Sequence, residues 1–450
     1  MPTQPKIDRY LGDGVFTIEG IRLNMGGLWR FSLRLLAENQ WHRTDFDVYV
    51  ALGDGAPASE EWSPTELVKI QSLSLEQLFA KPNDPSNRFA KNVDAAAFGK
   101  ALFFEKGLSK NGKISCASCH QPERSFTDGK RVGQGLSKLG RNTPSIIGAA
   151  YQTWFYWDGR RDSLWSQSIV PIEASLEMGK SRLEVLRWLK EQPEYAKQYE
   201  SIFGALPDLS DIAEKVATPL GDATAKLSWK NIPMRKKRAI NSAFSNIGKS
   251  IAAYEMSVLH QPSQFDRYAQ GLLSTGKTPL PGSELNDTEK RGLRLFIDDQ
   301  NRCLNCHNGP RFTNDGFHNV GTGTASGVGN DSGRLLGKQM VLLDEFNCAG
   351  RYSDANQSCT ELQYLEKNPA HITSEEGAFK VPSLRNVADT GPYMHDGRFK
   401  TLHDVLVHYR DATDGGAAQT ELLPLPELTD DDLKALEAFL KTLSASTTTN

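Results

Sequence analysis

The sequence lacks an apolar run long enough to cross a membrane, and it lacks an excess of charge of either sign. Its longest apolar-looking stretch, residues 143–157, is interrupted by polar side chains and is shorter than the about 20 residues that a spanning helix needs. The formal net charge of −3 predicts no bulk attraction to nucleic acid or to an anionic membrane. With 38% hydrophobic and 24% charged residues over 450 positions, the composition is that of a globular protein with two or three domains.

Cysteine is also scarce, yet four of the 6 cysteines stand in two C-x-x-C-H motifs, residues 116–120 and 303–307. Random placement of 6 Cys and 9 His predicts on the order of 0.002 such motifs. The spacing is typical of covalent haem attachment, in which both thiols bond to the vinyl groups and the histidine becomes the proximal iron ligand. A zinc site would need a fourth ligand nearby, and a thioredoxin-like redox pair has no use for the histidine. The motifs therefore predict two covalently bound haem c groups, held by Cys116, Cys119, His120, Cys303, Cys306 and His307.

The two remaining cysteines, Cys348 and Cys359, lie in a polar segment that contains glycine and serine. We expect them to form a loop disulfide, with a pair of free thiols as the less favoured alternative. Haem attachment of this kind and a disulfide both indicate a compartment outside the cytosol, so we expect a periplasmic protein. Because the first six residues show no apolar signal region, we expect a mature or trimmed chain whose export signal is missing from this sequence.

The first 55 residues have the pattern of β-structure. Apolar and polar side chains alternate over residues 29–35 and again over residues 46–50, which is the period of a strand. We expect about four strands in a small β-rich segment over residues 1–55, serving as a structural appendage or a docking surface. A linker broken by prolines follows over residues 56–92.

The remainder of the chain contains an internal repeat. Gly99–Phe103 before the first haem motif matches Gly292–Phe296 before the second, and Asp158-Gly-Arg160 after the first matches Asp396-Gly-Arg398 after the second. Two copies of one haem-binding unit are the simple explanation. The repeat therefore predicts a mainly α fold with two cytochrome-c-like haem domains in tandem, preceded by the β-rich segment.

The repeat also sets the expected domain boundaries. We expect the first haem domain over residues 93–258, an interdomain linker over residues 259–282 and the second haem domain over residues 283–450. A Thr429-x-x-Asp432 capping box predicts the start of the last helix. This helix should present four leucines on one side: Leu433, Leu436, Leu440 and Leu443.

The two copies differ at the position opposite the proximal histidine. Aligning them by Asp-Gly-Arg places Pro171 opposite Tyr409. If this position faces the distal side of each haem, Tyr409 ligates iron through its phenolate oxygen, whereas Pro171 has no side-chain donor. One haem would then be open to small molecules such as peroxide, and the other closed and suited to passing electrons. The alternative is that Tyr409 is a core aromatic at a helix end.

Three further residues surround the predicted open position. Glu177 could move a proton between the two oxygens of peroxide, and Gln167 could hold the peroxide by hydrogen bonds. Trp157 aligns with His395 of the second copy, and its indole could carry an electron between the haems. On spacing alone, a solvated acid at Glu177 and ordinary core packing at Trp157 are the competing interpretations.

These residues resemble a known family. Over about residues 90–445, the chain is similar to the bacterial diheme cytochrome c peroxidases and, more closely, to their MauG-like branch. Besides both haem motifs, the resemblance includes Arg141–Ser145, Phe155–Arg160, Thr390–Arg398 and His408-Tyr409.

The resemblance implies a role for each candidate residue. His120 would be the proximal ligand of a high-spin peroxidatic haem, and His307 that of a second haem whose other ligand is Tyr409. The distal acid–base pair, the distal proline and the inter-haem tryptophan would be Glu177, Gln167, Pro171 and Trp157. A calcium ion between the domains would be held by oxygens of Asn142, Thr390 and Pro392, which are donors that calcium prefers.

Two departures from the family pattern affect the expected activity. Residues 132–136 contain no histidine, although peroxidase members carry one in this loop that closes the peroxidatic haem until the other haem is reduced. This favours an enzyme that is ready for peroxide without prior reduction. Residues 300–302 read Gln-Asn-Arg where MauG places a relay tryptophan, so the exit path for electrons does not carry over.

We therefore expect a peroxide-reacting diheme oxidoreductase that shares the oxidising equivalents between its haems and oxidises a partner protein, with a tryptophan side chain as a candidate target. The first alternative is a peroxide scavenger that receives electrons from a small cytochrome c or cupredoxin. The second alternative is a non-catalytic diheme electron carrier, which would have two six-coordinate haems.

Overall fold

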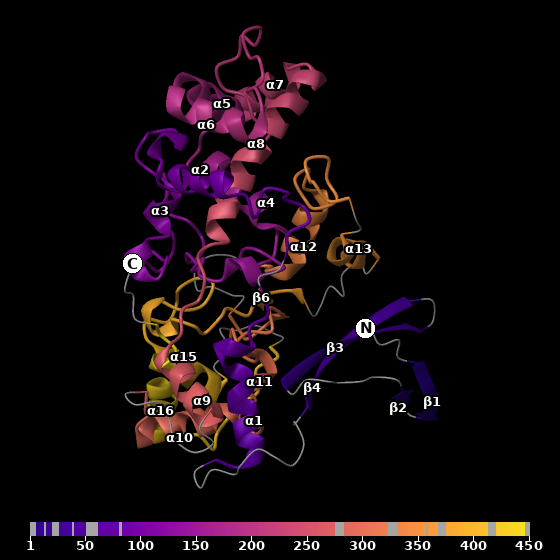
Figure 1. The fold of residues 1–450 in the computed structure, drawn as a ribbon, viewed down its shortest axis with the longest axis vertical. Coiled ribbons are helices and arrows are strands. Elements are labelled where there is room, and N and C mark those ends of the chain that lie inside the picture. Colours follow the sequence, from indigo (N-terminus) through magenta and orange to yellow (C-terminus); the bar gives the residue numbers. More distant parts are fainter. Residues whose placement is uncertain are drawn as a thin grey trace.

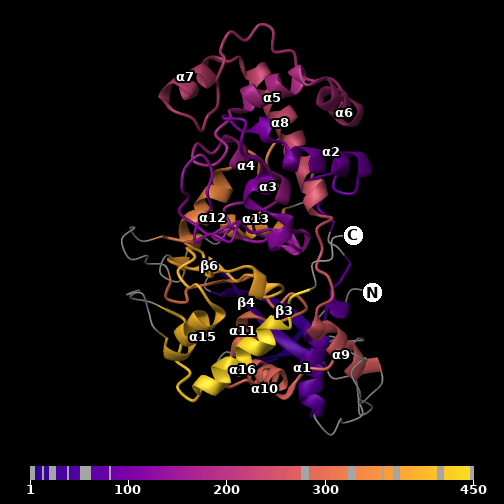
Figure 2. The same cartoon turned by 90° about the vertical axis from the view of Figure 1, so that its left-hand side faces the viewer.

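The computed structural model is mainly helical, as predicted (Figure 1). It describes residues 6–12, 15–19, 27–37, 40–50, 62–80, 83–274, 283–322, 331–356, 359–367, 375–412 and 420–445. Two groups of helices lie one above the other along the long axis, in both views (Figures 1 and 2). Among the described residues, no helix combines the length and the apolar character that crossing a membrane requires.

The predicted β-rich segment is present at the N-terminus. β1 (Lys6–Gly12) pairs with β2 (Val15–Glu19), and β3 (Gly27–Ala37) pairs with β4 (Gln40–Val50), both antiparallel. The alternation over residues 29–35 and 46–50 falls within β3 and β4. Within the described residues, the four strands form two separate two-stranded sheets, each made of strands that are neighbours in the sequence.

The first core is built around a close crossing of two helices, α2 (Val93–Phe104) and α8 (Met234–Glu255). A Cβ at Gly99 would lie 1.8 Å from the carbonyl oxygen of Ser250, so only glycine permits this approach. The other helices of this half are α3 (Cys116–Cys119), α4 (Leu164–Glu173), α5 (Arg182–Glu191), α6 (Pro193–Phe203) and α7 (Ala223–Asn231).

The second core repeats this crossing with α10 (Asp287–Ile297) and α16 (Asp430–Lys441). Here a Cβ at Gly292 would lie 1.9 Å from the carbonyl oxygen of Ala435. Thr429 caps α16 in a capping box, so the expected start of the last helix is confirmed. The four predicted leucines are buried, although Leu443 lies just past the end of α16. The other helices of this half are α1 (Pro64–Leu73), α9 (Gln264–Ser274), α11 (Cys303–Cys306) and α15 (Leu402–Asp411).

Both expected linkers contribute side chains to the second core. Trp62 and Leu73 come from the segment before the first half, and Phe265 and Tyr268 come from the segment that joins the halves. The Trp62 indole N–H donates to the Tyr268 hydroxyl at 2.6 Å, so the two segments are in direct contact. The segments before and after the first half therefore both pack into the second core.

A small insertion lies between the halves. It contains α12 (Arg334–Leu343), α13 (Thr360–Lys367) and the two-residue strands β5 (Phe317–His318) and β6 (Phe379–Lys380). The predicted disulfide between Cys348 and Cys359 is present. Short 3-10 turns complete the described elements: Leu75–Gln77, Lys106–Leu108, Pro122–Arg124, Ala149–Tyr151 and Val387–Asp389.

Candidate active site

Both halves line one cavity of about 1080 Å³. Pockets for a single small ligand usually measure roughly 300–1,000 Å³, so this space is large enough for more than one. Every residue predicted to bind a cofactor or to take part in catalysis lines the cavity except Cys116, which packs against the first core. The predicted residues on the wall are Cys119, His120, Asn142, Trp157, Gln167, Pro171, Glu177, Cys303, Cys306, His307, Thr390, Pro392 and Tyr409.

The two motif histidines are held in the same way. Nδ1 of His120 lies 3.1 Å from the carbonyl oxygen of Phe126, and Nδ1 of His307 lies 3.0 Å from that of Phe312. Both phenylalanines have positive φ, 57° and 53°, which bulky residues rarely adopt. An Nδ1–H that donates to a carbonyl leaves Nε2 with a free lone pair, which is the tautomer that binds a metal.

Burial keeps both imidazoles neutral. It lowers the pKa of His120, and it lowers the pKa of His307 to about 4. A neutral ring is the form that ligates a metal. The four motif cysteines are free thiols at the ends of two short helices, as covalent attachment requires.

The cavity wall also carries buried nitrogen atoms that lack a protein partner among the described residues: both ring nitrogens of His260, Nε of Arg311 and Nδ1 of His395. Buried polar groups without a partner are rare in native proteins, so these atoms indicate a polar occupant. Each haem brings two carboxylates that accept such bonds. Free thiols, neutral motif imidazoles and unpaired wall donors together fit two haem c groups.

The first half places Gln167, Pro171 and Glu177 on α4 and the turn that follows it. Gln167 and Pro171 are four residues apart and therefore share a face of the helix. Glu177 is partly buried, and desolvation raises the pKa of its carboxyl group although the positive charge of Arg160 lowers it. A carboxyl group with a raised pKa can both accept and return a proton near neutral pH.

The loop without a histidine packs against the backbone of Glu177. The backbone N–H of Leu136 donates to the Glu177 carbonyl at 2.8 Å, and that of Ser137 donates to the Leu176 carbonyl at 3.0 Å. A Cβ at Gly135 would lie 2.5 Å from the Cα atom of Glu177. In this conformation the loop supports the acid and brings no imidazole to the cavity.

The second half places Tyr409 near the end of α15, against the two motif cysteines. The residue is half-buried, and desolvation, together with Cys306 and Cys303, raises the pKa of its hydroxyl. The Tyr409 hydroxyl has no hydrogen-bond partner among the described residues, whereas the neighbouring His408 lies 2.8 Å from the Val320 carbonyl oxygen. The side chain is thus free to bind a group inside the cavity.

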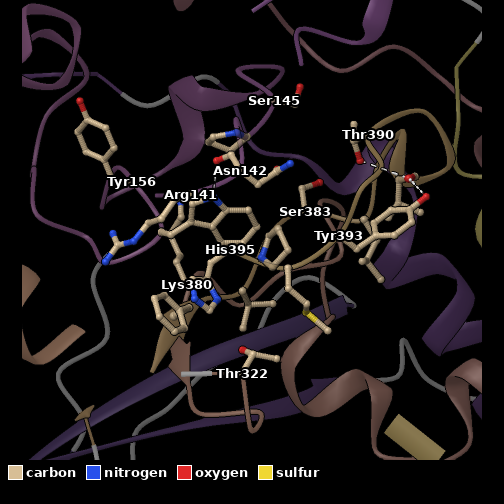
Figure 3. Close-up of a pocket in the computed structure, with 18 of the residues that line it drawn as sticks. Arg141, Asn142, Ser145, Tyr156, Thr322, Lys380, Ser383, Thr390, Tyr393 and His395 are labelled. Carbon is tan, nitrogen blue, oxygen red and sulfur yellow. Dashed lines mark hydrogen bonds between the residues drawn. The ribbon is translucent and has the colours of Figure 1, made fainter. Parts of the chain in front are cut away.

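Trp157 lies where the two halves meet. Its indole N–H donates to the Asn142 carbonyl at 3.0 Å, and its own carbonyl accepts from the backbone N–H of Lys380 at 2.8 Å. In Figure 3, Asn142 and His395 lie near the middle of the pocket, and the backbone N–H of Asn142 donates to the His395 carbonyl at 2.7 Å. The ring therefore has a fixed orientation between the two haem motifs.

The predicted calcium ligands line the same cavity but also make bonds within the protein. Asn142 donates from its amide nitrogen to the Lys130 carbonyl at 3.0 Å, which leaves its side-chain oxygen available. The hydroxyl of Thr390 donates to the Val387 carbonyl at 3.2 Å, and Pro392 follows a cis peptide bond. Among the described residues, no group of three or more acids, histidines and cysteines is placed to hold a metal ion. The calcium site stays a prediction.

Sequence reasoning missed several residues of the cavity. Lys380 is half-buried, and its ammonium group donates to the side-chain oxygen of Gln152 and to the Trp154 carbonyl at 3.0 Å. Desolvation lowers its pKa to about 8. The repeat could have indicated it, because Lys380 precedes Pro382 as Asn142 precedes Pro144. No sequence signal marks His260, a single histidine in the segment between the halves.

Comparison with known proteins agrees with this geometry. A family model described as "Di-haem cytochrome c peroxidase" matches residues 93–273. The chain is 32% identical over 377 residues to "Methylamine utilization protein MauG" of Methylorubrum extorquens, covering 83% of this chain and 85% of that protein. It is 28% identical over 360 residues to "Cytochrome-c peroxidase IdrP1" of a Pseudomonas species, covering 79% and 82%. The fold resembles the crystal structure of the diheme peroxidase BthA from Burkholderia thailandensis, with a TM-score of 0.57, 22% identity and coverage of 82% and 91%.

Proposed function

This chain belongs to the di-haem cytochrome c peroxidase family that includes the MauG proteins, and we propose that it uses peroxide to oxidise a partner protein. Membership makes it a di-haem c-type oxidoreductase that acts with peroxide. One observation carries the finer proposal: Pro171 and Tyr409 line the same cavity, and only the tyrosine offers a donor atom.

In this proposal the first half receives the peroxide. When bound, the haem attached at Cys116 and Cys119 supplies an iron that accepts a peroxide oxygen. Gln167 orients the peroxide through its side-chain amide. Glu177 takes the proton from one peroxide oxygen and returns it to the other, which leaves as water. The raised pKa of Glu177 suits both halves of this transfer.

The second half stores an oxidising equivalent. Tyr409 offers an anionic oxygen donor, which stabilises ferric over ferrous iron. Trp157 passes an electron between the halves, since its indole is fixed by the Asn142 carbonyl. A calcium ion held by Asn142, Thr390 and Pro392 would stiffen the contact between the halves.

The electrons come from a partner protein in the periplasm, with an exposed aromatic side chain such as tryptophan as the target. Gln300 to Arg302 replace the relay tryptophan before the second motif, so the electrons enter by a different path. Similarity to a cytochrome-c peroxidase supports a second candidate, a scavenger supplied by a small cytochrome c or cupredoxin.

Stopped-flow mixing of the isolated diferric protein with peroxide tests the proposal. We expect both haem spectra to change within one fast phase, without prior reduction. If the haem spectra do not change, the protein is not an enzyme that is ready for peroxide, and the electron carrier is the interpretation that remains. Rapid steady-state oxidation of reduced cytochrome c, with no modified partner, would instead support the scavenger.

A further inference from the structure

His260 is a buried histidine on the cavity wall. It lies outside both haem motifs and has no role in the proposed reaction. Its side chain belongs to a residue only 7% exposed, and neither Nδ1 nor Nε2 has a partner among the described residues. Leaving a buried polar group unsatisfied costs roughly 1–3 kcal/mol. The ring therefore faces a group that occupies the cavity in the working protein.

The protein fixes the place of this ring. The backbone N–H of Gly148 donates to the Val258 carbonyl at 2.8 Å, which ties the segment before His260 to the first half. Gly148 has a φ of +71°, and a Cβ there would lie 2.1 Å from Nε2 of His260. A glycine is thus required beside the imidazole, and the ring lies directly against the backbone.

The surroundings of the ring favour an anion. Arg311 is 7% exposed, binds the Asp315 carboxylate at 2.6 Å through Nη1 and has no partner for Nε among the described residues. Arg385 is paired with Asp266 at 2.6 Å. Burial, together with the charges of Arg385 and Arg311, lowers the pKa of His260 to about 3, so the ring is neutral and keeps one N–H to donate.

We propose that His260 and the Nε–H of Arg311 bind a propionate carboxylate of one of the two haems. In a haem c the two carboxylates lie on the ring edge opposite the vinyl groups, so a haem held at either C-x-x-C pair would extend its carboxylates away from those cysteines. A carboxylate accepts bonds from a neutral imidazole and a guanidinium together, and bonds to charged groups are the stronger ones. His260 is a positioning residue, and this role holds whether or not the protein oxidises a partner.

The role has a measurable electrostatic consequence. A donor on the propionate withdraws part of its negative charge from the iron, so removing the donor stabilises the ferric state. In the holoprotein, His260→Phe should shift the ferric-to-ferrous equilibrium of one haem toward ferric by about three- to tenfold, or up to about 59 mV in midpoint potential. The haem whose midpoint potential falls is the one whose propionate carboxylate binds His260.

The experiment is a spectroelectrochemical titration of both haems, together with resonance Raman measurement of the propionate bending modes. His260→Gln keeps an N–H donor and should restore most of the potential and the Raman frequency. His403→Phe is the control, since His403 is partly exposed and lies against Glu437 outside the cavity. Unchanged potentials and propionate modes in His260→Phe would overturn the proposal.

A second pair of variants tests the same contact without removing the ring. Gly148→Ala would push the imidazole from its place, and the same potential should fall. Gly112→Ala is the matched control, because Gly112 has a φ of +64° and nothing within 4 Å of a Cβ. If His260→Phe fails to bind both haems, the two alanine variants decide the question. Equal haem midpoint potentials in Gly148→Ala and Gly112→Ala would refute the proposal. Peroxide reactivity is read separately, so failure here leaves the proposed reaction untouched.

Discussion

The two halves of the molecule share one framework and differ in the residues that face the cavity. In both halves, a glycine allows two helices to cross with their backbones in contact. In both, the carbonyl of a phenylalanine with positive φ lies within hydrogen-bond distance of Nδ1 of the motif histidine. At matching positions of the repeat, however, the first half has Pro171 and the second has Tyr409, and both residues line the cavity. Under the proposed function, the two halves keep the same covalent haem attachment, and this one side chain makes the first haem open and the second closed.

The largest expected effect concerns the residue that only the first half provides. Glu177→Gln should slow the reaction with peroxide by about 10²- to 10⁴-fold and leave the haem spectra nearly intact, because the amide cannot move a proton. In the wild type the rate should fall at low pH, beginning above the usual range of a glutamate because the pKa of Glu177 is raised. Stopped-flow rates against pH measure both effects, with exposed Glu123→Gln as control. An undiminished rate in Glu177→Gln would remove this acid from the mechanism.

The next effect tests what the halves have in common. Gly99→Ala and Gly292→Ala should each destabilise the protein by about 1–3 kcal/mol, because the new methyl group meets a backbone carbonyl and the helices must separate. Gly140→Ala, with nothing within 4 Å of a Cβ, should change stability little. Chemical unfolding followed by circular dichroism measures all three. A loss confined to one of the two crossings would show that the halves are not equivalent in packing.

Replacing the residue that closes the second half should make its haem easier to reduce. Tyr409→Met exchanges an anionic oxygen donor for a neutral sulfur, so the ferric-to-ferrous equilibrium should shift toward ferrous by at least about tenfold, or 59 mV. Tyr393→Phe is the control within the same cavity, since its hydroxyl only donates to the Val387 carbonyl at 3.1 Å. Potentiometric titration is the measurement, and an unchanged potential in Tyr409→Met would refute the tyrosine as a ligand.

The last comparison concerns a buried acid that the first half alone carries, whose effect appears only as a dependence of stability on pH. Glu255 on α8 corresponds to Leu440 on α16 when the two crossings are superposed. Burial raises the pKa of Glu255 from 4.5 to about 8, and Ser168 donates to it at 3.1 Å. The folded state therefore holds this proton more tightly than the unfolded state does. Its stabilising effect is complete below pH 4.5 and is lost as the pH rises through 8, with a slope of at most about 1.4 kcal/mol per pH unit.

Thermal unfolding of the holoprotein between pH 5 and about 9 measures this slope. Glu255→Gln should flatten it, while Glu123→Gln should leave it as in the wild type. An identical slope in Glu255→Gln would show that the acid is not titrating in this range.

Much of this arrangement could be predicted because it depends on local sequence patterns. The haem motifs, the capping box before α16 and the matching Asp-Gly-Arg segments each depend on residues close together in the sequence. The disulfide followed from the two cysteines left over. The place of Trp62 in the second core and of His260 beside Gly148 depends on contacts between distant segments, which no local pattern specifies. The separation of the β-rich segment into two hairpins likewise depends on pairing that alternation alone does not determine.

The central claim is that one haem is open and the other is closed by Tyr409, and the electron paramagnetic resonance spectrum of the oxidised holoprotein tests it most directly. We predict one high-spin and one low-spin ferric signal in equal amounts, with only the low-spin signal altered in Tyr409→Met. Two low-spin signals in the wild type, or a high-spin signal that changes in Tyr409→Met while the low-spin signal does not, would contradict it.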